Sequence, residues 1–409
     1  MNSSCIKCRN ASPVVVLNVH DVYCKACFTQ YVRHKFRATL GKHHVFRYGD
    51  RVLVCFGGTL NSVVLLNLLA DAFSESSHKK IKIEPTIAIV LHWNEHGSSD
   101  DYIADVRARL AEAIAVYGNV VWPVVITTME NCLWNSCQAI QNNIVWFNKK
   151  EATNNPKRLE FCHQLLITNL LSSISNPTSC EEVYHRLYLL GLRRLARSLD
   201  IGKIIVADSM TDLSSRALHS VALGRGPQIA NDTAVIDDRL LPDLTKERDS
   251  TQTHKCSSGE QELVEEVLDR NVIQTWIVRP LRELSSKELG FYAHYSKLTA
   301  TITTNVASSN AVTPRPANVQ SISRDFVAGL QRQFPATVST VFSTSGKVLN
   351  SSNDLTHTVG SDQICRLCNS VCLADTMTTA QYNPDGLLLC RSCMFVLRDV
   401  EDINLLPPL

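Results

Sequence analysis

Short apolar runs alternate with longer amphipathic segments through the middle of the chain. The apolar runs predict buried parallel strands at 51–56, 86–91, 120–126, 203–207 and 275–278. Segments in which apolar residues recur every three or four positions predict helices at 62–73, 100–117, 181–199, 212–223 and 286–295. Strands and helices that alternate at this spacing predict an α/β fold with a doubly wound parallel sheet and helices on both faces.

Two polar segments interrupt this alternation. Residues 226–262 are polar and charged and predict an exposed insertion. Residues 299–318 are rich in Thr, Ser, Asn and Pro and predict a loop or linker. A further helix is expected to begin at Asn318 and to direct three apolar residues toward the C-terminal end of the chain, namely Phe326, Leu330 and Phe334.

A basic helix is predicted near the N-terminus, from Phe28 to Gly41, because apolar residues recur there at helical spacing. Residues 1–51 carry nine Lys and Arg against two Asp, whereas the whole chain has a net charge of only +2. Such a local excess predicts contact with a polyanion, and a merely solvated helix face is the alternative. The residues expected to contact RNA phosphate groups here are Arg33, Lys35, Arg37 and Lys42.

The sequence indicates the cellular compartment of the chain and therefore the chemical state of its fifteen cysteines. No stretch reaches the roughly 18–20 continuous apolar residues of a membrane span. The first five residues lack the charged-then-apolar order of a secretory signal. We therefore expect a cytoplasmic protein without a membrane partner, whose cysteines are metal ligands and buried thiols rather than disulfides.

Eight of these cysteines form two quartets at the two ends of the chain. Each quartet consists of two Cys-x2-Cys pairs, and each pair can offer two thiolates from one turn. Two structural zinc ions are therefore predicted, because four protein thiolates leave no open position for a substrate. The predicted ligands are Cys5, Cys8, Cys24 and Cys27 at one end and Cys365, Cys368, Cys390 and Cys393 at the other.

These patterns together predict five consecutive units. The units are an N-terminal four-cysteine zinc module at 1–30, a basic helix and linker at 31–50, an α/β domain at 51–298 with the insertion at about 226–262, a linker and helix at 299–345, and a C-terminal four-cysteine zinc module with its tail at 346–409.

A glycine pair after the first predicted strand is typical of a phosphate cradle. Gly57 and Gly58 precede a helix, expected to be capped by Ser62, and backbone N–H groups and the helix dipole favour an anion there. The stretch 56–62 (Phe-Gly-Gly-Thr-Leu-Asn-Ser), set between the two zinc-ribbon modules, resembles the Ser-Gly-Gly-x-Asp-Ser loop of the PP-loop ATP pyrophosphatases of tRNA thiolation. The resemblance implies their adenine nucleotide alpha-hydrolase-like fold and a degenerate nucleotide site at Gly57, Gly58, Thr59, Asn61, Ser62 and Asp208.

Five further blocks are similar to the second subunit of the cytosolic thiouridylases within this family: Pro13–Val16, His34–Lys42, Ala222–Gly226, Val278–Arg282 and Gln333–Val341. The resemblance implies a heterodimer with a catalytic PP-loop subunit. It also implies binding of tRNA and an indirect relation to a thiocarboxylated ubiquitin-like carrier that supplies sulfur. The product implied is the wobble 2-thiouridine (mcm5s2U) of cytosolic tRNAs for Lys, Glu and Gln.

Three departures from the catalytic pattern predict a non-catalytic subunit, a pseudo-enzyme. Phe56 and Leu60 stand where the family loop has Ser and Asp, which puts ATP binding in doubt. The stretch Arg186–Leu192 lacks the Cys-x-x-Cys-Gly of the catalytic relatives, and residues 279–296 lack their second reactive cysteine. Persulfide transfer or cluster ligation needs those thiolates, so no catalytic residue is assigned.

Several alternatives stay open at this point. The chain could be an ATP-dependent sulfurtransferase with an atypical pocket, in which a noncanonical cysteine such as Cys180 relays sulfur. It could also be a zinc-ribbon interaction protein unrelated to sulfur, in which the central sheet is only a scaffold. Asp208 is either a residue of the nucleotide crevice or the first-turn residue of a helix. Arg225, between two glycines, is expected to reach a phosphate of the RNA or a partner, with an ordinary solvated loop arginine as the alternative.

Overall fold

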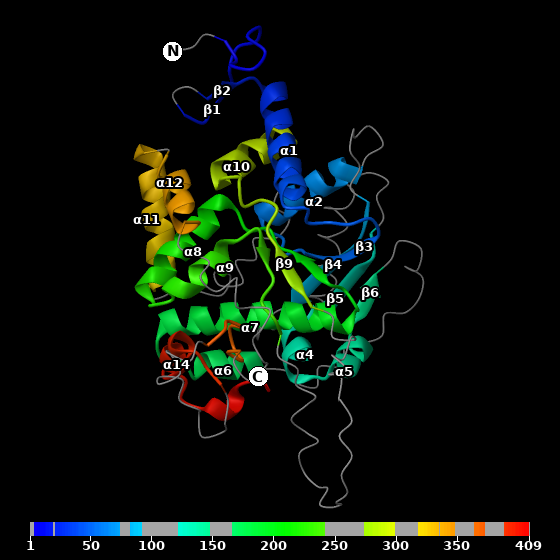
Figure 1. The fold of residues 1–409 in the computed structure, drawn as a ribbon, viewed down its shortest axis with the longest axis vertical. Helices are drawn as coiled ribbons and strands as arrows, with labels where there is room; N and C mark the ends of the chain where they lie inside the picture. Colours follow the sequence, from blue (N-terminus) through cyan, green and yellow to red (C-terminus); the bar gives the residue numbers. More distant parts are fainter. Residues whose placement is uncertain are drawn as a thin grey trace, which may run out of the picture.

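A seven-stranded sheet forms the centre of the computed structural model (Figure 1). The described residues are 4–18, 21–73, 82–91, 122–147, 166–241, 274–298, 318–334, 336–347, 364–372 and 388–408. The strand order is β6-β5-β4-β3-β7-β9-β8. The strands are β3 (Asp50–Cys55), β4 (Ile83–Leu91), β5 (Val124–Thr128), β6 (Val145–Phe147), β7 (Lys203–Ile205), β8 (Ile236–Asp237) and β9 (Trp276–Val278).

The five central strands are parallel, as the alternating pattern predicts, whereas the two edge strands are antiparallel. Val52 of β3 pairs with Pro85 of β4 on one side and with Lys203 of β7 on the other. β6 pairs antiparallel with β5, and β8 pairs antiparallel with β9. The edge strands were not predicted because three and two residues are too short to show a periodicity. The doubly wound parallel core is confirmed.

Helices cover both faces of the sheet, and the alternation of side chains along β3 shows which helices cover which face. Val52 and Val54 pack in one hydrophobic cluster with α2 (Leu60–Phe73) and α10 (Ser286–Tyr295). Leu53 and Cys55 point to the opposite face and pack with α7 (Pro177–Ser198). A strand buried on both faces explains the unbroken apolar run from which it was predicted.

The N-terminal segment forms a small hairpin followed by a long helix that packs on the sheet domain. The hairpin consists of β1 (Val15–Val16) and β2 (Val22–Tyr23), and α1 (Lys25–Lys42) follows it. Phe28, Val32 and Phe36 of α1 are at most 1% exposed and belong to the same cluster as α2 and α10. Burying each such side chain stabilises the docked helix by about 1.5–3 kcal/mol. α1 is therefore a continuous element across the predicted boundary at residue 30, and the division into units stays a prediction.

Several shorter helices complete the described part of the chain, with labels as in Figure 1. They are α4 (Met129–Trp134), α5 (Cys137–Asn142), α6 (Leu166–Ser172), α8 (Met210–Ala222), the 3-10 helix η1 (Gly226–Gln228), α9 (Ile229–Thr233), α11 (Val319–Gln333), α12 (Thr337–Ser345), α14 (Arg391–Leu397) and the 3-10 helix η3 (Ile403–Leu405). None of the helices in the described part of the chain is long and apolar enough to cross a membrane.

Two predictions about irregular segments need correction. Residues 226–241 are not an exposed insertion, because η1, α9 and β8 lie there and Ile229, Asp232 and Asp237 are at most 2% exposed. The prediction of exposure was wrong because most charged residues of this segment are buried as ion pairs. The helix at 318 exists as α11, but it packs on α8 through Val327, and Phe326 and Phe334 are exposed.

Three predicted segments fall outside the described residues. They are the helix at 100–117, the part of the polar segment from 242 to 262, and the loop at 299–317.

Candidate functional site

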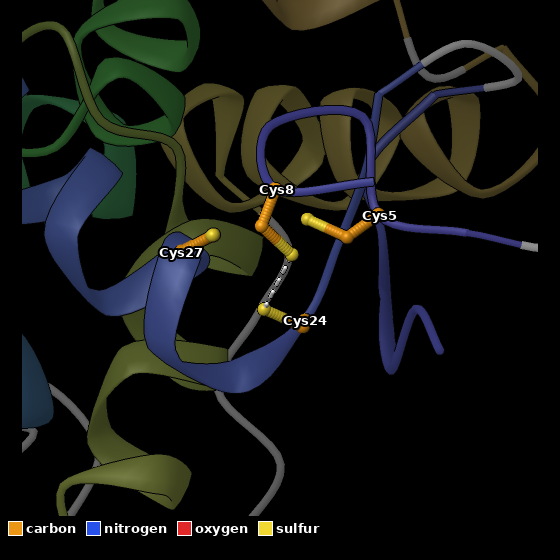
Figure 2. A group of neighbouring side chains, drawn as sticks. All are labelled: Cys5, Cys8, Cys24 and Cys27. Carbon is orange, nitrogen blue, oxygen red and sulfur yellow. Dashed lines mark hydrogen bonds between the residues drawn. The ribbon is translucent and has the colours of Figure 1, made fainter. Parts of the chain in front are cut away.

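The four N-terminal cysteines converge although they come from two separate turns. Cys5 and Cys8 lie in a tight turn before β1, which is closed by a 2.8 Å hydrogen bond from the Arg9 N–H to the Cys5 carbonyl. Cys24 is the N-cap residue of α1, and Cys27 lies in its first turn. The hairpin brings the two turns together, and Figure 2 shows the four sulfur atoms gathered around a common centre, with Cys8 Sγ 3.9 Å from Cys24 Sγ.

The four C-terminal cysteines are built into the chain in the same way. Cys365 and Cys368 lie in a turn, and Cys390 is the N-cap residue of α14, with Cys393 in the first turn of that helix. The distance between Cys368 Sγ and Cys390 Sγ is 3.7 Å. Three of these thiols are buried and Cys390 is half-buried, so this quartet lies deeper than the N-terminal one.

Both quartets have the donor set and the size that a zinc ion requires. The Sγ atoms within each quartet all lie within 4.8 Å of one another. A tetrahedral zinc ion with Zn–S bonds of about 2.3 Å separates its sulfur ligands by roughly 3.8 Å, which agrees with the two distances above. The predicted cysteines are therefore brought together in two groups that could each hold one zinc ion in a closed, structural site.

The loop between β3 and α2 joins a buried strand to a helix N-terminus through two glycines, Gly57 and Gly58. Gly58 has a φ of 69°, a conformation that glycine adopts without strain. Thr59 caps α2, because its Oγ1 accepts a 3.3 Å hydrogen bond from the Ser62 N–H, so the predicted cap at Ser62 is wrong. Phe56 is 3% exposed and supplies no hydroxyl group, and Leu60 supplies no carboxylate.

Asp208 and Asn61 lie at the point where the strand order reverses between β3 and β7, which is where ligands bind in sheets of this kind. Asp208 contacts two arginines, Arg216 at 2.9 Å and Arg279 at 3.1 Å. Burial raises the pKa of Asp208, but these arginines outweigh burial and hold the pKa well below its usual range. Asn61 donates a 3.0 Å hydrogen bond to Asp212 in the capping box of α8. The polar groups of the crevice are thus engaged by the protein itself.

A continuous series of buried ion pairs lies behind this crevice. Arg186 on α7 contacts Glu182 and Asp232 at 2.7 Å each. Arg239 shares Asp232 with Arg186 and also pairs with Asp237. Arg279 pairs with Asp237 as well and joins the series to Asp208. We call its members the arginine network: Arg186, Arg193, Arg216, Arg225, Arg239, Arg279, Glu182, Asp208, Asp232 and Asp237.

The arginine network excludes water from most of its charges. All its side chains except those of Arg216 and Asp208 are at most 4% exposed. Burial raises the pKa of Glu182, but Arg186 and Arg225 outweigh burial and hold the pKa at about 2, against an ordinary 4.5. Charges at such depth persist only when they are paired, so salt bridges hold the interior here.

The predicted RNA-contacting residues of α1 are partly occupied within the chain. Arg33 and Arg37 both pair with Asp71, at 3.2 and 2.7 Å, and Lys35 pairs with Glu288 at 3.1 Å. Lys42, at the end of α1, is exposed.

Arg225 requires a correction. It is 0% exposed and contacts Glu182 at 3.2 Å, so it lies in the interior and cannot reach an RNA phosphate. The flanking glycines suggested a flexible loop. The backbone instead forms a tight turn, in which the Arg225 N–H donates to the Ser220 carbonyl at 2.7 Å.

The cysteines outside the two quartets do not form a reactive pair in the described part of the chain. Cys55 and Cys132 are buried, and burial raises the pKa of both thiols, for Cys132 to about 12. Cys180 is half-buried near the start of α7, and its Sγ donates to the Leu171 carbonyl at 3.7 Å. Cys137 is exposed at the start of α5. Cys162 and Cys256 lie outside the described residues.

The arginine network is the feature that sequence reasoning missed. Arg186 and Asp232 are 46 residues apart in the chain, and Arg239 reaches Ser370 across 131 residues. One local signal was present, because Glu182 and Arg186 are an i,i+4 pair on one face of a helix. Their neighbours on that face, Val183 and Leu190, are apolar and buried, which marks it as an inward face.

Comparison with known proteins identifies similar chains. A family model described as cytoplasmic tRNA 2-thiolation protein 2 matches residues 318–385. The protein of that name from Aedes aegypti is 27% identical over 346 residues, which cover 84% of this chain and 65% of that protein. The human protein of that name is 25% identical over 402 residues, covering 89% of this chain and 71% of the human one. The chain thus spans about two thirds of the length of these relatives.

A solved structure shares the fold. The U34-tRNA thiolase NcsA from Methanococcus maripaludis, solved with its [4Fe-4S] cluster, superposes with a TM-score of 0.52 at 14% sequence identity. The superposition covers 98% of this chain and 97% of that chain. At this level of identity the likeness concerns the fold alone.

Proposed function

We propose that this chain is a member of the cytoplasmic tRNA 2-thiolation protein 2 family and the non-catalytic partner subunit of a cytoplasmic enzyme that 2-thiolates wobble uridines. Its substrates would be the tRNAs for Lys, Glu and Gln, with sulfur from a thiocarboxylated ubiquitin-like carrier. The observation that supports the non-catalytic role is Arg186 with its two carboxylate partners, Glu182 and Asp232, in the stretch that the resemblance equates with the position of the catalytic thiols.

The charge state of the crevice supports this role. Mg²⁺ on a bound nucleotide is usually held by one or two carboxylates. Asp208 is the acidic residue at the end of β7, and Arg216 and Arg279 already neutralise it. A metal–nucleotide complex would have to displace both arginines, of which Arg279 is 1% exposed. In this proposal the degenerate loop at Gly57 and Gly58 has a structural role only, and the catalytic partner subunit hydrolyses ATP.

A basic surface at the amino ends of the strands is the part of the chain best suited to contact tRNA. Four cations are exposed there: Lys42 at the end of α1, Arg47 before β3, Arg51 at the start of β3 and Lys82 before β4. Tyr48 is 81% exposed, and Lys82 Nζ lies 5.0 Å from the centre of its ring. Cations beside an exposed aromatic ring suit an RNA backbone with an unstacked base. The two zinc modules would be structural.

Reversing charge on this surface should weaken tRNA binding. We expect Lys42→Glu combined with Arg47→Glu to lower affinity and to reduce the slope of log K against log salt by about 2, roughly one per lost phosphate contact. Fluorescence anisotropy with labelled tRNA at several salt concentrations measures this slope. Arg332→Glu, a reversal of an exposed cation on α11, is the control and should change the slope little. An equal change of the salt slope in the double variant and in Arg332→Glu would show that this surface is not the tRNA-binding surface.

The proposed role is tested by a thiolation assay with purified chain, ATP, a sulfur donor and substrate tRNA, with and without the catalytic partner. We expect 2-thiouridine only when both proteins are present. Gly57→Ala should leave the rate within about twofold, because an added Cβ meets no heavy atom within 4 Å and the loop would bind no phosphate. Thiolation by the chain alone would instead favour a competent enzyme, with Cys137 and Cys180 as the described thiols to test first.

A further inference from the structure

The arginine network contains more positive than negative charge. Six arginines are joined by ion pairs to four carboxylates, which leaves an excess of two positive charges. Two neighbouring histidines add no charge at neutral pH, because burial lowers the pKa of His185 to about 3 and that of His219 to about 4. Uncompensated charge in a protein interior is costly, so an anion is expected at one end of the network.

One end of the network touches the C-terminal cysteine quartet. Arg225 Nη1 lies 3.6 Å from Cys393 Sγ, within hydrogen-bonding distance for sulfur. Arg239 Nη1 donates to the Cys368 carbonyl at 3.2 Å. The turn that holds Arg225 also contacts α14, because Ser392 Oγ donates to the Gly224 carbonyl at 3.0 Å. Two arginines of the network therefore contact residues that could ligate the metal.

We propose that the C-terminal metal centre is the counter-charge of the arginine network, with Arg225 as the residue that joins them. A zinc ion held by four thiolates carries a net charge of −2, which equals the excess of the network. Arg225 donates to one thiolate through Nη1 and contacts Glu182 at 3.2 Å through Nε. The C-terminal quartet is thus an electrostatic part of the α/β domain rather than a separable ribbon, and this inference does not depend on the thiolation role.

The proposal has a consequence for the metal-free protein. Without metal, the complex of net charge −2 is absent, and the two excess positive charges next to α7 and α9 lose that counter-charge. Loss of the C-terminal zinc should therefore loosen the sheet domain itself. Conversely, the charge on Arg225 should hold the metal, because contacts of this kind around ligands typically change metal affinity by about 10–100-fold.

Zinc release from the full-length chain tests the proposal, measured with a coloured chelator that reports each released ion. Arg225→Met removes the charge with little change of volume and should speed release of one of the two zinc ions by about tenfold or more. Glu182→Gln also disrupts a buried pair, but it increases the positive excess, so its zinc release should be no faster than that of the wild type. A Cys24→Ser background, which lacks the N-terminal site, identifies which ion is affected.

The two variants distinguish an electrostatic effect on zinc release from a general loosening of the fold, because only the electrostatic effect changes the release rate in Arg225→Met and not in Glu182→Gln. Faster release in both Arg225→Met and Glu182→Gln would overturn the proposal, as would unchanged release in Arg225→Met. If the methionine variant does not fold, Arg225→Lys replaces it. The lysine retains the charge but loses the forked donor, so its release rate should lie within about tenfold of the wild type. A larger increase would equally contradict the proposal.

Discussion

Replacing Arg186 with methionine will lower the free energy of unfolding by about 3–5 kcal/mol at neutral pH. The variant retains most of the side-chain volume but removes the positive charge that lies 2.7 Å from both Glu182 and Asp232. Each carboxylate then keeps only one arginine partner, and both stay buried at 2% exposure. Urea unfolding of the zinc-loaded chain measures the difference.

The effect should depend on pH in a defined direction. The pKa of Glu182 is held at about 2 in the folded chain, below its ordinary 4.5, so its contribution to stability is complete above pH 4.5 and is lost as pH falls toward 2. The difference between wild type and Arg186→Met should therefore shrink over this interval. Arg324→Met is the control, because Arg324 is 52% exposed in its pair with Glu181 and should cost less than about 1 kcal/mol. Equal losses for both variants would contradict the buried character of the network.

Replacing Cys24 with serine should halve the zinc content, from two ions per chain to one. Folding of small zinc modules is coupled to metal binding, with apparent binding energies of about 10–16 kcal/mol, so the hairpin β1–β2 should unfold. α1 should stay in place, because Phe28, Val32 and Phe36 remain buried against α2 and α10. Metal analysis gives the stoichiometry, and limited proteolysis should cut only before residue 25.

A serine at an exposed, metal-free thiol provides the control for this experiment. Cys137→Ser should retain both zinc ions and resist proteolysis like the wild type. Retention of two ions by Cys24→Ser would show that the N-terminal quartet is not a zinc site. Cleavage within α1 would show that the metal, rather than the apolar face of the helix, holds α1 on the sheet domain.

The sheet could be predicted from sequence because its central strands are buried on both faces. Val52, Leu53 and Val54 form a continuous apolar run, which is typical of a parallel strand that is buried on both faces. The cysteine quartets could also be predicted, since their spacing alone places two thiolates on each turn. Both signals are local, and each needs only a handful of neighbouring residues to be recognised.

The interior of the crevice could not be predicted, because its contacts join distant parts of the chain. Arg225 illustrates the difficulty. Between two glycines it has the pattern of an exposed loop residue, yet its position is decided by Glu182 and Cys393, which are 43 and 168 residues away. The acidic residues of the segment 226–241 suggested solvent exposure for the same reason. Local polarity does not distinguish a solvated charge from one that is buried with a partner.

The short antiparallel strands at both edges of the sheet limit how any second protein can associate with this one. β8 has two residues, and β6 has three. So few free backbone N–H and C=O groups offer little template for an added strand, and short edge strands are a common protection against edge-to-edge association. Strand addition is therefore a poor route for a binding partner, whereas packing of side chains against the helices on the two faces avoids this limit. Amyloid-like growth through the central sheet is disfavoured for the same geometric reason.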